Sequence, residues 1–208
     1  VIVMGSGGHA SVVIDILEEM GIYKIVGIVT KGMKIGEVFQ GYTVLGDQDI
    51  LPAYYDKGVT NIAMGIGGFK NNDLRKKFFL KFKQIGFNVV NAIHPSSIIS
   101  KNVAVGEGVV VFQGVIINTL VNIGDNVIIA TGASIDHETT IGSHTLISAG
   151  VTVGANDVIC EGVLLALGSK VVSAIKIEKN ILIGAGAVVV KDCLEEGMYL
   201  GIPAKLKK

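Results

Sequence analysis

His137 and Glu138 are the adjacent side chains of this 208-residue chain whose types best suit acid–base chemistry. Histidine titrates near neutral pH and is the side chain that most often serves as a general base. Glu138 or Asp136 could raise the basicity of the imidazole. Acyl transfer needs such a base together with N–H donors for the oxyanion, which the backbone near Gly154–Ala155 could supply. The alternative is that His137 is a solvated surface histidine.

An aliphatic residue recurs at every sixth position from residue 93 to residue 189, and all but Leu165 are β-branched. A strict period of six is typical of a parallel β-helix, in which three hexapeptides form one triangular coil and coils stack about 4.8 Å apart. Each aliphatic side chain would point into the prism, where its burial is worth roughly 1.5–3 kcal/mol. The positions are Ile93, Ile99, Val105, Val111, Ile117, Ile123, Ile129, Ile135, Ile141, Ile147, Val153, Ile159, Leu165, Val171, Ile177, Ile183 and Val189.

The hexapeptide register places His137 and Glu138 at the third and fourth positions, which face outward. The residue four places after the aliphatic position is usually small or aliphatic, and Asp157 is the charged exception. Residues one coil apart should lie above one another, so small and polar groups would frame the histidine and leave room for a ligand. The predicted columns are Thr119, His137 and Ala155, and beside them Asn118, Asp136 and Gly154.

Strand and helix patterns alternate in residues 1–90, which predicts a parallel sheet. The predicted strands are Val1–Met4, Lys24–Val29, Asn61–Met64 and Phe87–Val90. The predicted helices are Ala10–Met20, Gln48–Lys57 and Asn72–Gln84. We therefore expect a Rossmann-like α/β domain over residues 1–91, a parallel β-helix over 92–193 and a C-terminal cap over 194–208.

A glycine-rich segment, Gly5-Ser-Gly-Gly-His9-Ala10, follows the first predicted strand and opens the first helix. This context favours an anion or a nucleotide at the helix N-terminus. The segment also fits a loose dinucleotide pattern, but NAD is disfavoured because no acidic residue follows the second strand to hold a ribose hydroxyl. His9 either contacts the ligand or caps the turn.

Bulk composition excludes several classes of function. Basic and acidic residues balance at 18 each, so the chain lacks the basic surplus of a nucleic-acid binder. No apolar run is long enough for membrane insertion. Two cysteines without metal or redox spacing, and no secretion signal, favour a cytoplasmic setting. Lysines gather from position 170 onward, where they would bind an acidic cofactor or form a solvated end of the solenoid.

Four sequence motifs occur in order along the whole chain. They are Gly5-Ser-Gly-Gly-His9-Ala10, Ala92-Ile-His94-Pro95-Ser96, Ala133-Ser-Ile-Asp-His137-Glu138, and Gly184-Ala-Gly-Ala-Val-Val-Val-Lys191-Asp192 with Gly201-Ile-Pro203-Ala-Lys205. Together they resemble the sialic-acid O-acetyltransferase family, which includes bacterial nucleotide-sugar N-acetyltransferases. The resemblance implies a left-handed β-helix, a homotrimer, acetyl-CoA between adjacent subunits, no metal, and a nucleotide-linked sugar in the N-terminal domain.

Matching positions carry the family's site onto this chain. His137 would be the catalytic base and Glu138 the residue that tunes it. The sugar-nucleotide residues would be Gly7, Gly8, His9, Thr30, Lys31 and Gly67. The cofactor residues would be Gly154, Ala155, Leu167, Ala185, Gly186 and Lys191.

Two positions depart from the family pattern. Leu146 stands where members often carry a second histidine near the thioester carbonyl, which leaves a side-chain oxyanion contact open. Thr30 and Lys31 stand where members often carry acidic residues, which leaves the nucleotide open.

We expect acetylation of a sugar amino group, on a nucleotide-linked sugar, with acetyl-CoA as the donor. One alternative is O-acetylation of a sugar hydroxyl, as in sialic acid. Another is a non-catalytic partner that binds a sugar nucleotide. A β-helix metalloenzyme of the γ-carbonic-anhydrase type would need three histidines around zinc, whereas the repeat proper holds His137 and His144.

Overall fold

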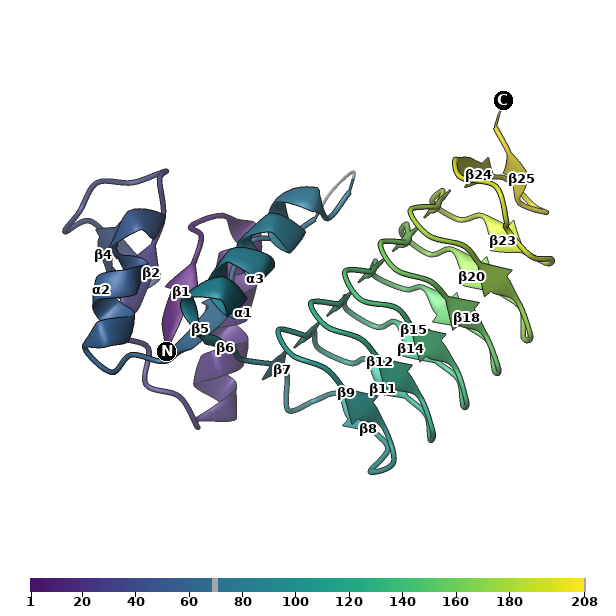
Figure 1. Cartoon of the computed structure of the whole chain (residues 1–208). Helices are drawn as coiled ribbons and strands as arrows, with labels where there is room; N and C mark the ends of the chain where they lie inside the picture. Colours follow the sequence, from purple (N-terminus) through teal and green to yellow (C-terminus); the bar gives the residue numbers. More distant parts are fainter. Residues whose placement is uncertain (69–70, 208) are drawn as a thin grey trace.

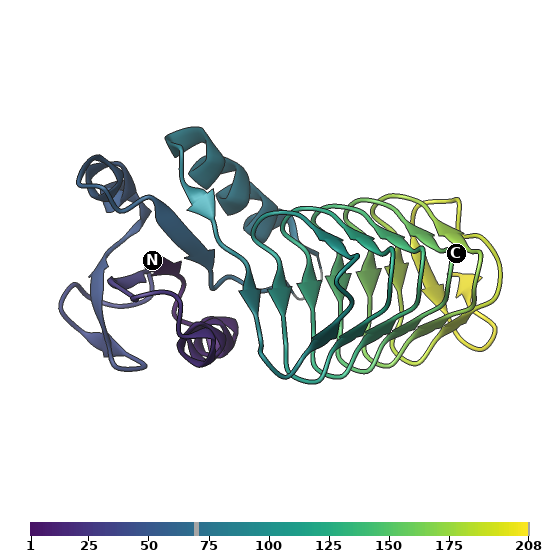
Figure 2. The same ribbon diagram turned by 90° about the horizontal axis from the view of Figure 1, so that it is seen from below.

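The computed structural model describes residues 1–68 and 71–207. It consists of a small α/β domain followed by a long three-sided solenoid of short parallel strands. Figure 1 shows the α/β domain at one end of the solenoid and the C-terminus at the other. Figure 2, turned by 90°, shows the coils stacked along one axis. No helix among the described residues is long and apolar enough to span a membrane.

The α/β domain is built on a six-stranded sheet with the order β3-β4-β2-β1-β5-β6. Neighbouring strands are parallel except for the antiparallel pair β3 and β4. The strands are β1 (Ile2–Met4), β2 (Gly27–Val29), β3 (Val38–Phe39), β4 (Tyr42–Gly46), β5 (Asn61–Met64) and β6 (Asn88–Val89). The helices are α1 (Gly8–Met20), the short 3-10 helix η1 (Gln48–Ile50), α2 (Leu51–Asp56) and α3 (Asp73–Ile85).

Helices cover both faces of this sheet. Val13 and Leu17 of α1 pack with Val3 on one face. Phe79 and Phe82 of α3 pack on the other face with the neighbours of Val3 in β1, together with Leu51 of α2. Successive residues of a strand point to opposite faces, so β1, which is buried on both, reads as a continuous apolar run.

The predicted elements are confirmed, with Asn61–Met64 at the observed bounds and shifts of up to three residues at the ends of the others. The hairpin of β3 and β4 was not predicted. Its turn is formed by Gln40 and Gly41, both with positive φ (48° and 81°). Only Val44 and Gly46 of this hairpin are buried, so its sequence carries little apolar periodicity.

The solenoid is a parallel β-helix with three sheets, and every predicted aliphatic position is the second residue of a two-residue strand. The first sheet holds β7 (Ala92–Ile93), β10 (Val110–Val111), β13 (Ile128–Ile129), β16 (Leu146–Ile147), β19 (Leu164–Leu165), β22 (Leu182–Ile183), β24 (Met198–Leu200) and β25 (Lys205–Leu206). The second holds β8 (Ile98–Ile99), β11 (Ile116–Ile117), β14 (Ser134–Ile135), β17 (Thr152–Val153), β20 (Lys170–Val171) and β23 (Val188–Val189). The third holds β9 (Ala104–Val105), β12 (Asn122–Ile123), β15 (Thr140–Ile141), β18 (Val158–Ile159) and β21 (Lys176–Ile177).

The aliphatic column forms the core of the solenoid. From Val111 to Val189 these side chains are at most 4% exposed. At the first coil, the α/β domain supplies a cover, since the N–H of Ile93 donates to Sδ of Met20 (3.4 Å). At the last coil, β24 and β25 add to the first sheet and bury Tyr199. The unpaired strand edges at both ends of the stack are therefore covered. The domain boundaries at 91/92 and 193/194 stay predictions.

Candidate active site

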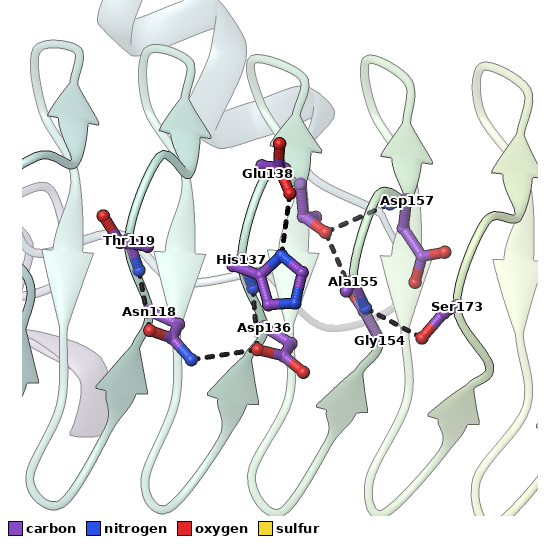
Figure 3. Close-up of polar contacts among 10 residues, drawn as sticks. Asn118, Thr119, Asp136, His137, Glu138, Gly154, Ala155, Asp157 and Ser173 are labelled. Carbon is purple, nitrogen blue, oxygen red and sulfur yellow. Dashed lines mark hydrogen bonds and ion pairs between the residues drawn. The ribbon is translucent and has the colours of Figure 1, made fainter.

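His137 lies in the loop that joins β14 to β15, at the corner between the second and third sheets (Figure 3). Its backbone N–H donates to Oδ1 of Asp136 (2.8 Å), and the same oxygen accepts from Nδ2 of Asn118 one coil earlier (2.9 Å). The predicted stacking of Asn118 and Asp136 is thus observed. The His137 side chain is 43% exposed, as its hexapeptide position predicted.

Glu138 fixes the orientation of the imidazole. Nδ1 of His137 lies 2.9 Å from Oε2 of Glu138, and Glu138 reaches this position with a left-handed backbone (φ 58°). A carboxylate accepts but does not donate, so Nδ1 carries the proton and Nε2 keeps its lone pair. Figure 3 shows the ring extending toward the coil that carries Ala155. His137 can therefore accept a proton at Nε2 from a ligand on this corner.

Gly154 and Ala155 lie one coil beyond His137, as predicted (Figure 3). A Cβ at Gly154 would lie 2.6 Å from the backbone nitrogen of Ser173, so only glycine fits. The N–H of Ala155, one of the expected oxyanion donors, donates to Oγ of Ser173 in this structure (3.1 Å), and its role toward the thioester stays a prediction. The side chain from the next coil, which hexapeptide spacing alone does not mark as functional, takes this bond.

A buried polar network holds the loop of Gly154 from inside the prism. Oγ1 of Thr139 donates to the carbonyl of Gly154 (2.8 Å) and accepts from the N–H of Asp157 (3.1 Å). The carboxylate of Asp157 accepts from the N–H of Ile175 (2.8 Å) and is completely buried. Burial raises the pKa of Asp157 to about 6, against the opposing effect of the N–H bonds that it accepts.

An apolar cavity of about 390 Å³ runs along the first sheet. Leu167 and Ala185, both predicted cofactor residues, line it together with His9 of the α/β domain. Small side chains such as Ala130 and Ala166 form its floor. This cavity follows the first sheet and its corner with the second, whereas His137 lies at the corner between the second and third. Within a single chain, His137 therefore does not lie at the cavity that His9 lines.

Arg75, the single arginine of the chain, fixes His9. Its guanidinium is fully buried and donates to the carbonyls of Met64 (3.0 Å), Ile66 (2.7 Å) and Gly108 (2.8 Å). Burial lowers the pKa of Arg75 to about 9, which leaves it charged at neutral pH. Nη1 of Arg75 also lies 3.4 Å from Nε2 of His9.

Because Arg75 can only donate, Nε2 of His9 is the acceptor and Nδ1 carries the proton. Burial, and then the charge of Arg75, lower the pKa of His9 to about 3, so the ring is neutral. His9 is thus a fixed, uncharged donor at the wall of the apolar cavity. Sequence reasoning missed Arg75, although a single arginine inside an otherwise lysine-only set was a usable signal.

A second cavity of about 690 Å³ opens at the carboxyl ends of β2 and β4. Thr30 and Lys31, both predicted substrate residues, line it with Lys34 and Asp47. Thr30 Oγ1 lies 2.8 Å from Ser6 Oγ, which links this cavity to the glycine-rich segment. Asp47, which follows β4, was not predicted because the hairpin that precedes it was not.

The remaining predicted residues are placed as follows. Gly7 and Gly8 are exposed at the N-terminus of α1, where Gly7 makes no side-chain cap, and Gly67 packs against His9, since a Cβ there would lie 3.1 Å from that side chain. Gly186 and Lys191 are exposed on the solenoid and line neither cavity described above.

His144, the second histidine of the repeat, packs between the solenoid and the α/β domain. His144 is buried, with Nδ1 2.9 Å from Nδ2 of Asn126 and its ring against Phe79. Burial, and then Lys76, lower the pKa of His144. Leu146 is buried on the first sheet and lines the apolar cavity, and its side chain has no N–H or O–H to donate to an oxyanion. In the described residues, no group of three His, Cys, Asp or Glu side chains is placed to hold a metal ion.

Proteins of known structure match this chain over its whole length. Residues 1–82 match the family model of the PglD N-terminal domain. The chain is 36% identical to PerB of Caulobacter crescentus, solved with CoA and GDP-perosamine, over 100% of this chain and 96% of that chain (TM-score 0.84). Two further structures of that protein, described as GDP-perosamine N-acetyltransferase, carry a histidine replaced by alanine or asparagine.

The acetyltransferase domain of PglB from Neisseria gonorrhoeae is similar as well. It is 26% identical over 99% of this chain and 98% of that chain (TM-score 0.90), and it was also solved with acetyl coenzyme A. These matches confirm the family resemblance and the left-handed β-helix. The chain belongs to the acetyl-CoA-dependent nucleotide-sugar N-acetyltransferases of the hexapeptide-repeat, left-handed β-helix class.

Proposed function

We propose that this chain transfers the acetyl group of acetyl-CoA to an amino group of a nucleotide-linked sugar, with His137 as the general base. One observation carries the proposal: Glu138 holds the proton on Nδ1 of His137 (2.9 Å), which leaves Nε2 free at an exposed corner. The histidine variants solved for the Caulobacter enzyme support a role for an imidazole in this family.

The acceptor would lie against the α/β domain. Thr30, Lys31 and Lys34 line the cavity at the ends of β2 and β4, and two lysines suit a nucleoside diphosphate. The uncapped N–H groups at the start of α1, beside Gly7, add partial positive charge. The sugar would then extend past His9, whose Nδ1–H suits a hydroxyl or a phosphate oxygen. The neighbour with bound GDP-perosamine supports this class of substrate.

The donor would lie along the solenoid. A cavity floored by Ala130 and Ala166 and walled by Leu167 suits an apolar, extended pantetheine arm. Leu167 is 61% exposed, and a ligand on this face would cover it. Lys191 and Gly186 stay candidates for the phosphate-bearing end of the cofactor.

A homotrimer would complete the site, since His137 and the His9 cavity lie on different corners of one chain. Cyclic assembly is a common arrangement in which one corner of each subunit meets another corner of its neighbour. Large apolar side chains on the outside of the solenoid support such contacts. They include Ile98 (67% exposed), Ile116 (48%), Leu120 (52%) and Val158 (42%). His137 of one subunit would thus face the cavity of the next.

The proposed reaction is a direct transfer. The sugar nitrogen attacks the thioester carbon, and the carbonyl electrons move to oxygen. His137 accepts a proton from nitrogen at Nε2, the tetrahedral intermediate expels the thiolate, and the protonated His137 gives that proton to the sulfur. Amine and thioester thereby give amide and thiol.

The test is a thiol-release assay with acetyl-CoA and a panel of amino sugars, free and linked to GDP, UDP or dTDP. We expect release with one nucleotide-linked amino sugar, a gain of one acetyl mass in the product, and an amide that resists hydroxylamine. Loss of the product acetyl group to hydroxylamine would instead indicate O-acetylation. Failure of every acceptor to release thiol, with the fold intact, would favour a non-catalytic binding partner. Such substrates and the free thiols of Cys160 and Cys193 fit a cytoplasmic setting.

A further inference from the structure

The hydroxyl of Ser173 lies at the same corner of the solenoid as His137, two coils further along, and it has no role in the reaction proposed above. Its Oγ accepts the N–H of Ala155 (3.1 Å), and Figure 3 places Ala155 and Ser173 on the two coils that follow His137. Ser173 is exposed, whereas Ala155 is buried. The polar group that an incoming ligand meets on this corner is therefore the serine hydroxyl rather than the backbone N–H.

Gly154 allows the hydroxyl to sit this close to the backbone. A Cβ at Gly154 would lie 2.9 Å from Oγ of Ser173, so any larger residue would displace the hydroxyl. The network of Thr139 and Asp157 holds the same loop from inside the prism. The position of Oγ is thus set by a glycine outside and by buried hydrogen bonds inside, which gives a preorganised donor.

Ser173 accepts a hydrogen bond and still has a proton to give. A hydroxyl that accepts from an N–H becomes a stronger donor, because linked hydrogen bonds polarise one another. In the part of the chain that the structure describes, no acceptor is recorded for this proton. The Ser173 side chain is exposed at the corner between the second and third sheets, the same corner that carries His137.

We propose that the Ser173 hydroxyl donates to the thioester oxygen as negative charge develops there, with the Ala155 N–H behind it. The inference rests on the proposed function, in which His137 takes the proton from the attacking nitrogen. The carbonyl electron pair moves onto the oxygen that Ser173 holds, and it returns when the C–S bond breaks. Ser173 keeps its own proton throughout.

The chain contains a matched control for this contact. Oγ of Ser143 accepts the N–H of Asp125 (3.1 Å), and a Cβ at Gly124 would lie 2.7 Å from that oxygen. The same serine-over-glycine arrangement therefore recurs on the corner after the third sheet, away from His137. Removing the Ser143 hydroxyl therefore measures what such a contact contributes to the stability of the solenoid.

The experiment compares Ser173→Ala, Ser173→Thr and Ser143→Ala in the thiol-release assay, with thermal unfolding to verify each fold. We expect Ser173→Ala to lower kcat about 10- to 100-fold, less than loss of a sole oxyanion donor because the freed Ala155 N–H compensates in part. KM for acetyl-CoA should change less than about threefold, since the donor acts on the transition state. Ser173→Thr should retain activity and Ser143→Ala should match the wild type.

An unchanged or raised kcat in Ser173→Ala would overturn the inference, because the Ala155 N–H would then act directly. An equal loss in Ser143→Ala would also overturn it, because the effect would be structural. His137→Ala separates the two proposals. Full activity in His137→Ala would exclude His137 as the general base. The Ser173 and Ser143 variants test only the contact with the oxyanion.

Discussion

Replacing Arg75 with lysine should weaken both the fold and sugar-nucleotide binding. Arg75 donates to three buried carbonyls, and one of them, on Gly108, belongs to the first coils of the solenoid. A lysine ammonium is a single point donor and cannot reproduce this fork. With two carbonyls left without a donor at about 1–3 kcal/mol each, we expect the free energy of unfolding to fall by about 2–6 kcal/mol.

The functional effect should follow from His9. Without Nη1 at 3.4 Å, Nε2 of His9 loses the donor that fixes its tautomer. We expect KM for the nucleotide sugar to rise about 10-fold, the cost of one poorly oriented hydrogen bond, while KM for acetyl-CoA stays within about twofold. Urea unfolding by circular dichroism at fixed protein concentration and steady-state kinetics measure the two effects. Lys77→Ala, at an exposed position on the same helix, is the control.

The reasoning on Arg75 would be refuted by a loss of less than about 1 kcal/mol in Arg75→Lys, because each unpaired buried carbonyl carries at least that cost. An equal rise of both KM values would also refute it, since the effect would then be a general loosening of the subunit.

Two further predictions concern carboxylates. Glu138→Gln should lower kcat about 10-fold with little change in either KM, because the charge-assisted bond to Nδ1 of His137 is lost at a partly exposed site; wild-type kcat would contradict the assigned tautomer. Asp157→Asn should stabilise the fold at pH 8 by about 1–3 kcal/mol, since burial raises the pKa of this carboxyl from 3.8 to about 6 and its ionisation costs stability. The protonated carboxyl stabilises the wild-type fold fully below pH 3.8, and this stabilisation is lost as pH rises through 6. Urea unfolding should therefore show the stability advantage of Asp157→Asn vanish near pH 4. A difference in free energy of unfolding that stays constant from pH 4 to pH 8 would refute the argument.

The solenoid could be predicted from sequence because one local rule governs it. Each aliphatic residue from Ile93 to Val189 needs only its own hexapeptide to be placed in the prism, so spacing fixes register, columns and the outward position of His137. The contact between Asn118 and Asp136 follows from the same rule.

Other features depend on contacts that spacing does not encode. The role of Arg75 arises from the docking of α3 against the first coils, which joins residues far apart in the chain. The hairpin of β3 and β4 lies at the edge of its sheet and buries few apolar side chains, so Asp47 was missed with it. Ser173 was missed because its importance comes from a neighbour one coil away, the Ala155 N–H.

A subunit-complementation experiment tests the central claim, that His137 of one subunit serves the cavity of another. His137→Ala removes the base, and Ala166→Trp fills the cavity along the first sheet. Each variant alone should be inactive. In co-expressed mixed trimers at equal amounts, each interface has one chance in four of pairing an intact base with an intact cavity, so about a quarter of wild-type activity should return. No recovery in mixed trimers verified by native mass spectrometry would contradict the shared site.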